Sequence, residues 1–401
     1  MKKSLVALAA LAATSAFAQS SVQIDGIFDA GYYSIDYKGN KVTGMAVANG
    51  SSTSQINFRG TQDLGGGLKA NFRLESDFNP GSQKHNQGAG TQAGTLATGS
   101  TWGNGEARVG LDGGFGRVDL GVVNHETLTS FLAGQPFGTA VGSTFRRIGR
   151  ADTVNAINAS QVRTENAIKY ITPSINGFKG SLYKASKVSV NNSNSFSTTY
   201  GTFDVPGVTE FSLQYNKGPI NAVYSSHKTD NVNVHGAQTA AFSSTTSATP
   251  ITYTTTAAGT TKATLNTLGA NYTMGAVTVY ALNQTSKTDA ATPAYDVKLT
   301  MLSAAYQMGV HRFMVGTGTA SDSGSSNNAT GNGKGLDTKI TSLGYDYALS
   351  KTVALYARHE NINDKGSVVP AIGASGANTF TTAETRNGNR TTTAIGLRVN
   401  F

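Results

Sequence analysis

The last eleven residues, TTTAIGLRVNF at positions 391–401, decide the fold. Threonine, isoleucine, leucine, valine and phenylalanine occupy the odd positions, and threonine, alanine, glycine, arginine and asparagine the even ones. This period of two predicts a strand with one apolar face and one polar face. In a water-soluble protein such a strand would be an exposed edge, whereas in a membrane barrel it closes the ring against the first strand.

The N-terminus has the pattern of an export signal. Lys2 and Lys3 precede a short apolar run, and the letters AFA at positions 16–18 form an A-x-A cleavage motif. The apolar run is too short to span a membrane as a helix. We therefore expect residues 1–18 to be removed on export and residues 19–401 to form one domain.

Composition narrows the class of protein. The chain has 47 glycines, 8 prolines, no cysteine and 38% hydrophobic residues, with a net charge of +9. Disulfides therefore cannot stabilise the fold. After the signal, no stretch approaches the ~18 consecutive apolar residues that a membrane helix needs. A soluble secreted all-β protein and an outer-membrane barrel both remain possible at this point.

Hairpins with alternating faces recur along the whole chain. The clearest lies at residues 54–78, where apolar side chains at 68, 70, 72 and 74 alternate with Lys69, Asn71, Arg73 and Glu75. Seven hairpins and two single terminal strands predict sixteen strands. The hairpins cover residues 54–78, 106–123, 163–184, 211–227, 265–282, 297–315 and 340–358, and the terminal strands residues 22–32 and 391–401.

Long polar connections alternate with the tight hairpin turns. A soluble sandwich has no reason to separate loop lengths in this way, but an outer-membrane barrel does. We therefore predict an all-β, 16-stranded antiparallel transmembrane barrel with short periplasmic turns and long extracellular loops. Aromatic residues at the strand ends predict girdles at the two membrane interfaces. The long connections cover residues 33–53, 78–104, 124–162, 187–207, 230–263, 287–296, 321–335 and 363–390.

An ordered set of short segments resembles one family, the general porins of Gram-negative outer membranes, most closely the beta-proteobacterial type. The segments are VQIDGIFDAG at 22–31, DLGGG at 63–67, VGLDGGFGRVDLG at 109–121, NAIKY at 166–170, YALSK at 347–351 and GLRVNF at 396–401. The resemblance implies a homotrimer in the outer membrane, in contact with lipid and lipopolysaccharide. Each protomer would form a water-filled diffusion pore narrowed by its third loop, residues 124–162. It also implies that the barrel-assembly machinery recognises Phe401.

Basic residues of inward parity are the candidate pore residues. A ring of arginines in a narrow aqueous channel attracts anions, so we predict anion selectivity. In the alternative interpretation, these groups pair with lumen acids such as Glu75, Asp119 and Glu165 and leave a weakly selective pore. The strands contribute Arg59, Lys69, Arg73, Arg108, Arg117, Lys169, Arg358 and Arg398, and the third loop contributes Arg146, Arg147, Arg150 and, at its exit, Arg163.

The third loop departs from the family pattern at one position. Many relatives carry an acid beside the proline of the constriction segment, where this chain has Gln135 before Pro136. Glu126 and Asp152 are the acids that could still create a field across the pore. We therefore expect a constriction with a positive bias.

Other functions find little support. The six histidines show no metal-binding spacing, no serine has the setting of a catalytic nucleophile, and no basic-aromatic cluster indicates nucleic-acid binding. We expect no enzyme activity, metal or cofactor. The remaining alternative is a substrate-specific channel for organic acids or sugars. A sugar channel would need an aromatic path along the lumen, and the sole tryptophan, Trp102, lies in a predicted loop.

Overall fold

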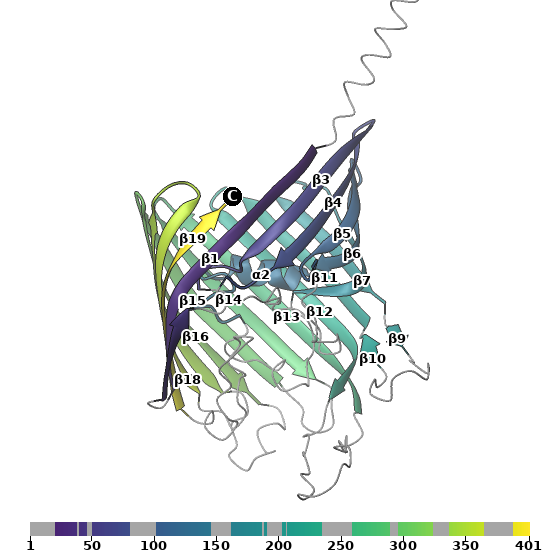
Figure 1. Ribbon diagram of the computed structural model, residues 1–401. Coiled ribbons are helices and arrows are strands. Elements are labelled where there is room, and N and C mark those ends of the chain that lie inside the picture. Colours follow the sequence, from purple (N-terminus) through teal and green to yellow (C-terminus); the bar gives the residue numbers. More distant parts are fainter. Residues whose placement is uncertain are drawn as a thin grey trace, which may run out of the picture.

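The computed structural model describes most of the strands and part of the connections (Figure 1). The predicted signal, residues 1–18, lies outside the described residues. No described helix is both long and apolar enough to cross a membrane. The description covers residues 21–37, 40–45, 50–80, 102–145, 162–186, 188–190, 203–205, 207–234, 259–288, 296–323, 337–364 and 388–401.

Sixteen described strands form a closed antiparallel barrel, which confirms the predicted fold. Each strand pairs with its neighbour in the chain, and tight turns join the hairpin arms at the end where the C-terminus lies (Figure 1). The barrel strands are β1 Ser21–Tyr37, β3 Gln55–Gly65, β4 Leu68–Asp77, β5 Ala107–Gly113, β6 Gly116–Asn124, β7 Arg163–Ile171, β8 Phe178–Ala185, β11 Gly207–Lys217, β12 Ile220–Val234, β13 Gly259–Met274, β14 Val277–Thr288, β15 Asp296–Met308, β16 His311–Asp322, β17 Thr338–Ala348, β18 Val353–Asp364 and β19 Gly388–Asn400.

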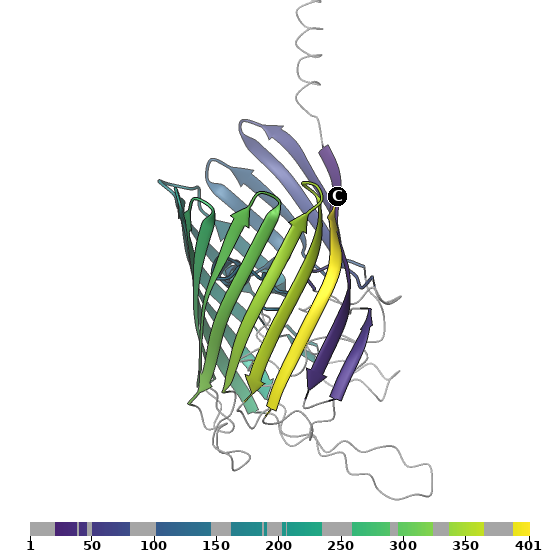
Figure 2. The same ribbon diagram turned by 90° about the vertical axis from the view of Figure 1, so that its left-hand side faces the viewer.

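The two terminal strands close the ring. β1 and β19 pair in antiparallel register from Ile27 opposite Asn400 to the far end of β1. Gly26 and Phe401 then exchange backbone hydrogen bonds of 3.0 and 3.1 Å, so the pairing extends to the last residue. Figure 2 shows the yellow strand β19 lying beside the purple strand β1. The expectation that residues 391–401 form a seam with the first strand is confirmed.

Alternation along the strands separates the two faces of the wall. Ile395 is 57% exposed, whereas its neighbour Ala394 is fully buried. Phe401 is also exposed, and Arg398 lies on the opposite, inner face. The outer face therefore presents apolar side chains to lipid. Outward aromatic side chains at or near strand ends, as expected for an interfacial girdle, are Phe115, Phe178, Tyr272 and Tyr306, whereas Phe28 and Phe72 lie in the middle of β1 and β4.

Several strands extend beyond their predicted ends, and three of the predicted loops contain additional strands or a helix that the sequence pattern did not indicate. Residues 33–37 continue β1 and pair with β2, Asn40–Met45. A two-stranded sheet forms from β9, Val188–Val190, and β10, Phe203–Val205. The third loop contains helix α2, Glu126–Ala133. These elements are short, and pairing or packing partners stabilise them where local periodicity is too brief to detect.

The inner face of β13–β18 carries a large cluster of buried apolar side chains alongside polar groups such as Glu360 and Arg358, whereas the inner face of the hairpin at 54–78 is mostly charged. Phe131 and Phe137 of the third loop pack on it and complete a buried cluster inside the barrel. Figure 1 shows α2 within the barrel, and its packing partners include β12, β13 and β14. The third loop therefore folds inward, onto this side of the wall. The wall residues of the cluster are Ala263, Leu265, Leu282, Val297, Leu299, Met301, Ala305, Met314, Ala320, Ile340 and Ile362.

Gly269 makes this close packing possible. A Cβ atom at Gly269 would lie 1.7 Å from the carbonyl oxygen of Ser130 and 2.8 Å from the amide nitrogen of Gly134. Both are backbone atoms, so α2 can rest on β13 only where the strand has no side chain.

We predict that Gly269→Ala displaces α2 toward the lumen and lowers single-channel conductance, at a cost of about 1–3 kcal/mol in stability. Gly180→Ala is the control, because a Cβ atom there finds its nearest neighbours at 3.7 Å. Equal conductance in the two variants would contradict the role of Gly269.

Candidate channel constriction

Three of the predicted lumen arginines lie opposite one another on adjacent strands. Arg59 of β3 is in register with Arg73 of β4, and Arg73 is in register with Arg108 of β5. Arg117 of β6 lies on the same inner face, nearer the tight turns. Tertiary pairing thus converts residues spread over two hairpins into one patch, which we call the arginine row: Arg59, Arg73, Arg108 and Arg117.

Carboxylates lie beside the central arginines of this row. Arg73 forms ion pairs with Glu75 and Glu106, the second at 2.8 Å. Arg108 lies 3.3 Å from Glu106 and 3.0 Å from Asp119. Like charges opposite one another on neighbouring strands repel, and these acids offset that repulsion.

The two outer arginines of the row are also paired but more exposed. Arg59 lies 2.8 Å from Asp25, with its side chain 45% exposed, compared with 11% for Arg108. Arg117 lies 2.8 Å from Asp119 and 4.0 Å from Asp112. The arginine row is therefore a mixed wall of guanidinium and carboxylate groups rather than a bare basic surface.

In the alternative interpretation, the lumen acids Glu75, Asp119 and Glu165 pair with the basic residues. The structure shows such pairs for two of these three acids. Glu75 and Asp119 pair with lumen arginines, whereas Glu165 is exposed. Sequence reasoning did not name Glu106 and Asp25 as partners. The alternation of side chains between the two faces of a strand predicts both. Glu106 lies two residues before Arg108 and so on the same inner face, and Asp25 lies on the face opposite to that of the outward Ile24.

The base of the third loop is fixed to this charged wall at its entry. Lys169 of β7 donates a hydrogen bond to the carbonyl of Asn124 and forms an ion pair with Glu126, each at 2.8 Å. Burial alone would raise the pKa of Glu126, but Lys169 and nearby hydrogen bonds outweigh it and hold that pKa below its ordinary value. The carboxylate therefore stays charged, and this ion pair intact, in mildly acidic solution.

The exit of the third loop is fixed in the same way. Arg163 lies 3.0 Å from Glu75 and 3.2 Å from Asp77, and all three side chains are buried. The amide of His125 donates a 2.7 Å hydrogen bond to the carbonyl of Val162, which joins the entry to the exit. Glu75 thus links the loop to the arginine row.

The far part of the described third loop is bound to the opposite wall. Glu360 of β18 accepts a 2.7 Å hydrogen bond from the amide of Gly142, and Ser342 of β17 donates one of 2.6 Å to its carbonyl. Asn271 of β13 donates a 2.8 Å hydrogen bond to the carbonyl of Ala133. These bonds hold Ala133 and Gly142 of the loop on the wall formed by β13–β18.

Gln135 has a structural role within the loop. It is 2% exposed, donates to Ser143 at 2.8 Å and accepts from the amide of Thr144 at 3.1 Å. An ionised acid could not donate the first of these bonds. The departure from the family pattern therefore stabilises the loop and places no charge in the pore.

Three of the predicted pore residues, Arg146, Arg147 and Arg150, lie outside the described residues, as does Asp152. Arg358 and Arg398 occupy a second region of the wall. Arg358 forms a 2.7 Å ion pair with Asp346, and Arg398 donates a 2.8 Å hydrogen bond to Ser51. Within the described part of the chain, Lys69, Lys179 and Arg398 form no ion pair.

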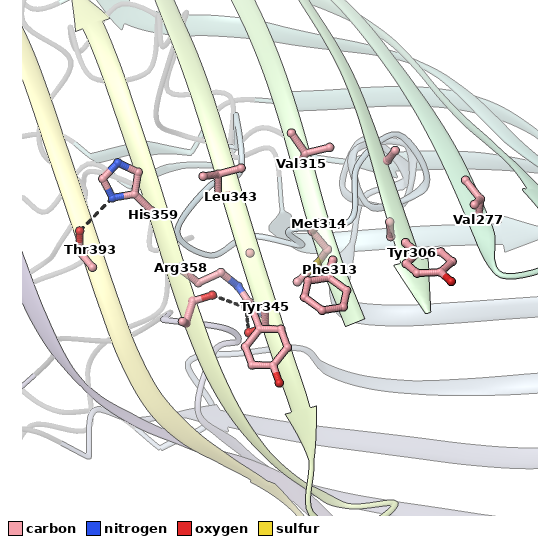
Figure 3. Close-up of a pocket in the computed structure, with 14 residues that line it drawn as sticks. Val277, Tyr306, Phe313, Met314, Val315, Leu343, Tyr345, Arg358, His359 and Thr393 are labelled. Carbon is pink, nitrogen blue, oxygen red and sulfur yellow. Dashed lines mark hydrogen bonds between the residues drawn. The ribbon is translucent and has the colours of Figure 1, made fainter. Parts of the chain in front are cut away.

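A separate apolar pocket of about 490 Å³ lies on the outer side of the barrel (Figure 3). Exposed side chains that face lipid, such as Val315 and Leu343, form much of its lining. His359 and Thr393 are bound to each other at 2.9 Å beside it. The pocket belongs to the outer surface and takes no part in the constriction.

The fold and the site together define the class of protein. A closed antiparallel barrel with an apolar exterior, and with a loop folded inward to face a charged wall, is an outer-membrane channel.

Comparison with known proteins identifies the family. The Gram-negative porin family matches residues 4–367, and the chain belongs to it. It is 30% identical over 395 residues to an outer membrane porin protein of Bordetella pertussis, covering 89% of this chain and 93% of that protein. Over 232 residues it is 33% identical to outer membrane porin protein 32 of Delftia acidovorans, covering 55% of this chain and 58% of that protein. The resemblance to beta-proteobacterial porins is confirmed.

Solved structures share the fold. The anion-selective porin from Comamonas acidovorans superposes with a TM-score of 0.68 at 21% identity, covering 96% of this chain and all of that one. The trimer form of OmpT from Vibrio cholerae gives 0.63 at 11% identity, covering 95% and 99%. Family membership places the protein in the outer membrane, among channels rather than enzymes.

We predict that Glu126→Gln loosens the entry of the third loop, because it leaves the buried ammonium of Lys169 without its counter-charge. Loss of one partner of a buried pair costs about 3–5 kcal/mol. Current fluctuations in single-channel recordings should increase and the urea midpoint should fall. Glu165→Gln removes an exposed charge nearby and should change neither quantity. A quiet Glu126→Gln channel would show that the pair does not hold the loop.

Proposed function

We propose that the protein forms a water-filled channel through which small hydrophilic solutes and ions diffuse passively, with a preference for anions. The observation that supports this most directly is the arginine row on the inner face of the wall. Guanidinium groups remain charged at any relevant pH, and a narrow channel strengthens their effect on passing ions. The shared fold with the anion-selective porin from Comamonas acidovorans favours the same preference.

The ion pairs limit how much of this preference the wall can supply. Because Asp25, Glu75, Glu106, Asp112 and Asp119 offset the arginine row, its net charge is small. We therefore assign most of the selectivity to Arg146, Arg147 and Arg150 of the third loop. Lys69, Lys179 and Arg398, which have no ion pair among the described residues, add positive charge on the inner face.

The wall still contributes to permeation through its exposed arginines. The Arg59 side chain is 45% exposed, and Asp25 occupies only the Nε–Nη2 edge of its guanidinium, so the other edge remains available. A passing carboxylate or phosphate could exchange with that weak, hydrated pair at low cost. The arrangement supports transient contact rather than tight binding, as passive diffusion requires.

We predict that the double variant Arg146→Glu/Arg147→Glu shifts the reversal potential under a KCl gradient toward cation preference. Four units of charge near a hydrated ion change its energy by about 1 kcal/mol after screening, or about fivefold in permeability ratio. Lys217→Glu/Lys351→Glu makes the same charge change at exposed tight turns and should have little effect. Unchanged selectivity in the third-loop variant would remove these arginines from the mechanism.

We also propose that the protein works as a homotrimer assembled by the barrel-assembly machinery in a lipid and lipopolysaccharide membrane. The trimer form of OmpT, which shares the fold, supports the oligomeric state. Phe401, exposed at the end of the seam, is the proposed assembly signal.

Deletion of Phe401 should reduce the yield of folded barrel in the outer membrane by more than half, while the channels that do form keep normal conductance. Loss of two seam hydrogen bonds and of the signal both act on assembly rather than on the lumen. Heat-modifiable gel mobility measures the yield, and Leu349→Ala, at an exposed turn, is the control. Normal yield without Phe401 would refute its role.

A further inference from the structure

Two histidines and a glutamate meet at the root of the third loop. His125 precedes α2, Glu210 lies on β11 and His227 lies on β12. Their potential ligand atoms all lie within 4.8 Å of one another, and the three side chains are at most 1% exposed. No spacing in the sequence brings these residues together. Figure 1 shows α2 inside the barrel, where it also contacts β11 and β12.

Glu210 is a buried carboxylate with little cationic compensation. It accepts hydrogen bonds from the backbone amide of Glu126 and from Thr127, the second at 2.9 Å. Its one ion-pair partner among the described residues is His227, whose Nδ1 lies 2.9 Å from Oε2. Glu75, by contrast, is a buried lumen acid that is paired with Arg73 and Arg163. A buried carboxylate without lysine or arginine is suited to binding a metal cation.

The outer nitrogens of both imidazole rings are held by threonines. Nε2 of His125 lies 2.9 Å from Oγ1 of Thr164, and Nε2 of His227 lies 3.1 Å from Oγ1 of Thr229. The two ring centroids are 4.6 Å apart. Histidines that bind metals usually donate their second N–H to such an oxygen, which orients the ring. This arrangement directs Nδ1 of His227 toward Glu210.

We propose that His125, Glu210 and His227 bind one divalent transition-metal ion of the Zn²⁺ class. Two imidazoles and one carboxylate form a ligand set that such ions prefer, and water can fill the remaining position. Bonds of about 2.0–2.2 Å in a tetrahedral site would separate Nδ1 of His227 and Oε2 of Glu210, now 2.9 Å apart, slightly and bring the more distant ligand atoms closer together. The ion would join the entry of the third loop to two wall strands, so its binding would reduce loop motion.

Zinc titration of the full-length protein tests this proposal. The protein is prepared without a polyhistidine tag, folded in detergent and freed of metal with EDTA. Calorimetry with ZnCl₂ should give one ion per chain, and Co²⁺ should produce the visible bands of a four-coordinate histidine–carboxylate site. His227→Gln should weaken zinc binding at least about tenfold. His359→Gln, which changes an exposed outer histidine, should bind as the wild type does.

Three results would overturn the site. They are no stoichiometric zinc binding by wild-type protein, a six-coordinate Co²⁺ spectrum, or equal affinity in His227→Gln and His359→Gln. If His227→Gln loses its heat-modifiable band and so does not fold, His125→Gln replaces it, because the side chain of His125 makes no cap hydrogen bond to α2. The Co²⁺ spectrum of the wild type decides the question without any variant.

Discussion

The structure depends on one constraint: no backbone N–H or C=O group may remain unpaired within the hydrocarbon of a bilayer. A sheet meets it only by closing on itself, and the pairing of β1 with β19 provides that closure. The exchange of hydrogen bonds between Gly26 and Phe401 extends the pairing to the end of the chain. Since the ring is closed, every barrel strand has two neighbours. The two faces of the wall then differ in what they meet, with lipid outside and the lumen inside.

Within that ring, the inner face is divided into two chemically different halves. β3–β7 present arginines and carboxylates, whereas β13–β18 present a cluster of buried apolar side chains, beside which Arg358 and Glu360 lie. The third loop covers the apolar half with Phe131 and Phe137, because those wall residues would otherwise face water. The hydrophobic effect thus places the loop, and the loop determines which residues a passing solute meets.

Charge at the constriction is balanced rather than simply basic. Arg73 and Arg163 share Glu75, so one carboxylate serves both the wall and the loop exit. Lys169 and Glu126 hold the entry. Glu75, which offsets part of the arginine charge, thus also fixes the exit of the third loop. Selectivity and rigidity are therefore coupled, and a charge change at one of these positions affects both.

Local sequence was sufficient to predict the strands, which side chains point inward or outward, and the closing seam between the first and last strands. A period of two is visible within eight to ten residues, as in residues 391–401. Alternation also assigned Arg59, Arg73 and Arg108 to the lumen. It could not show that they lie in one row, that α2 rests on Gly269, or that Gly142 binds Glu360, 218 residues later. His125 and His227 likewise form no motif in the chain. These contacts join strands distant in sequence, so only closure of the barrel and the inward fold of the third loop decide them.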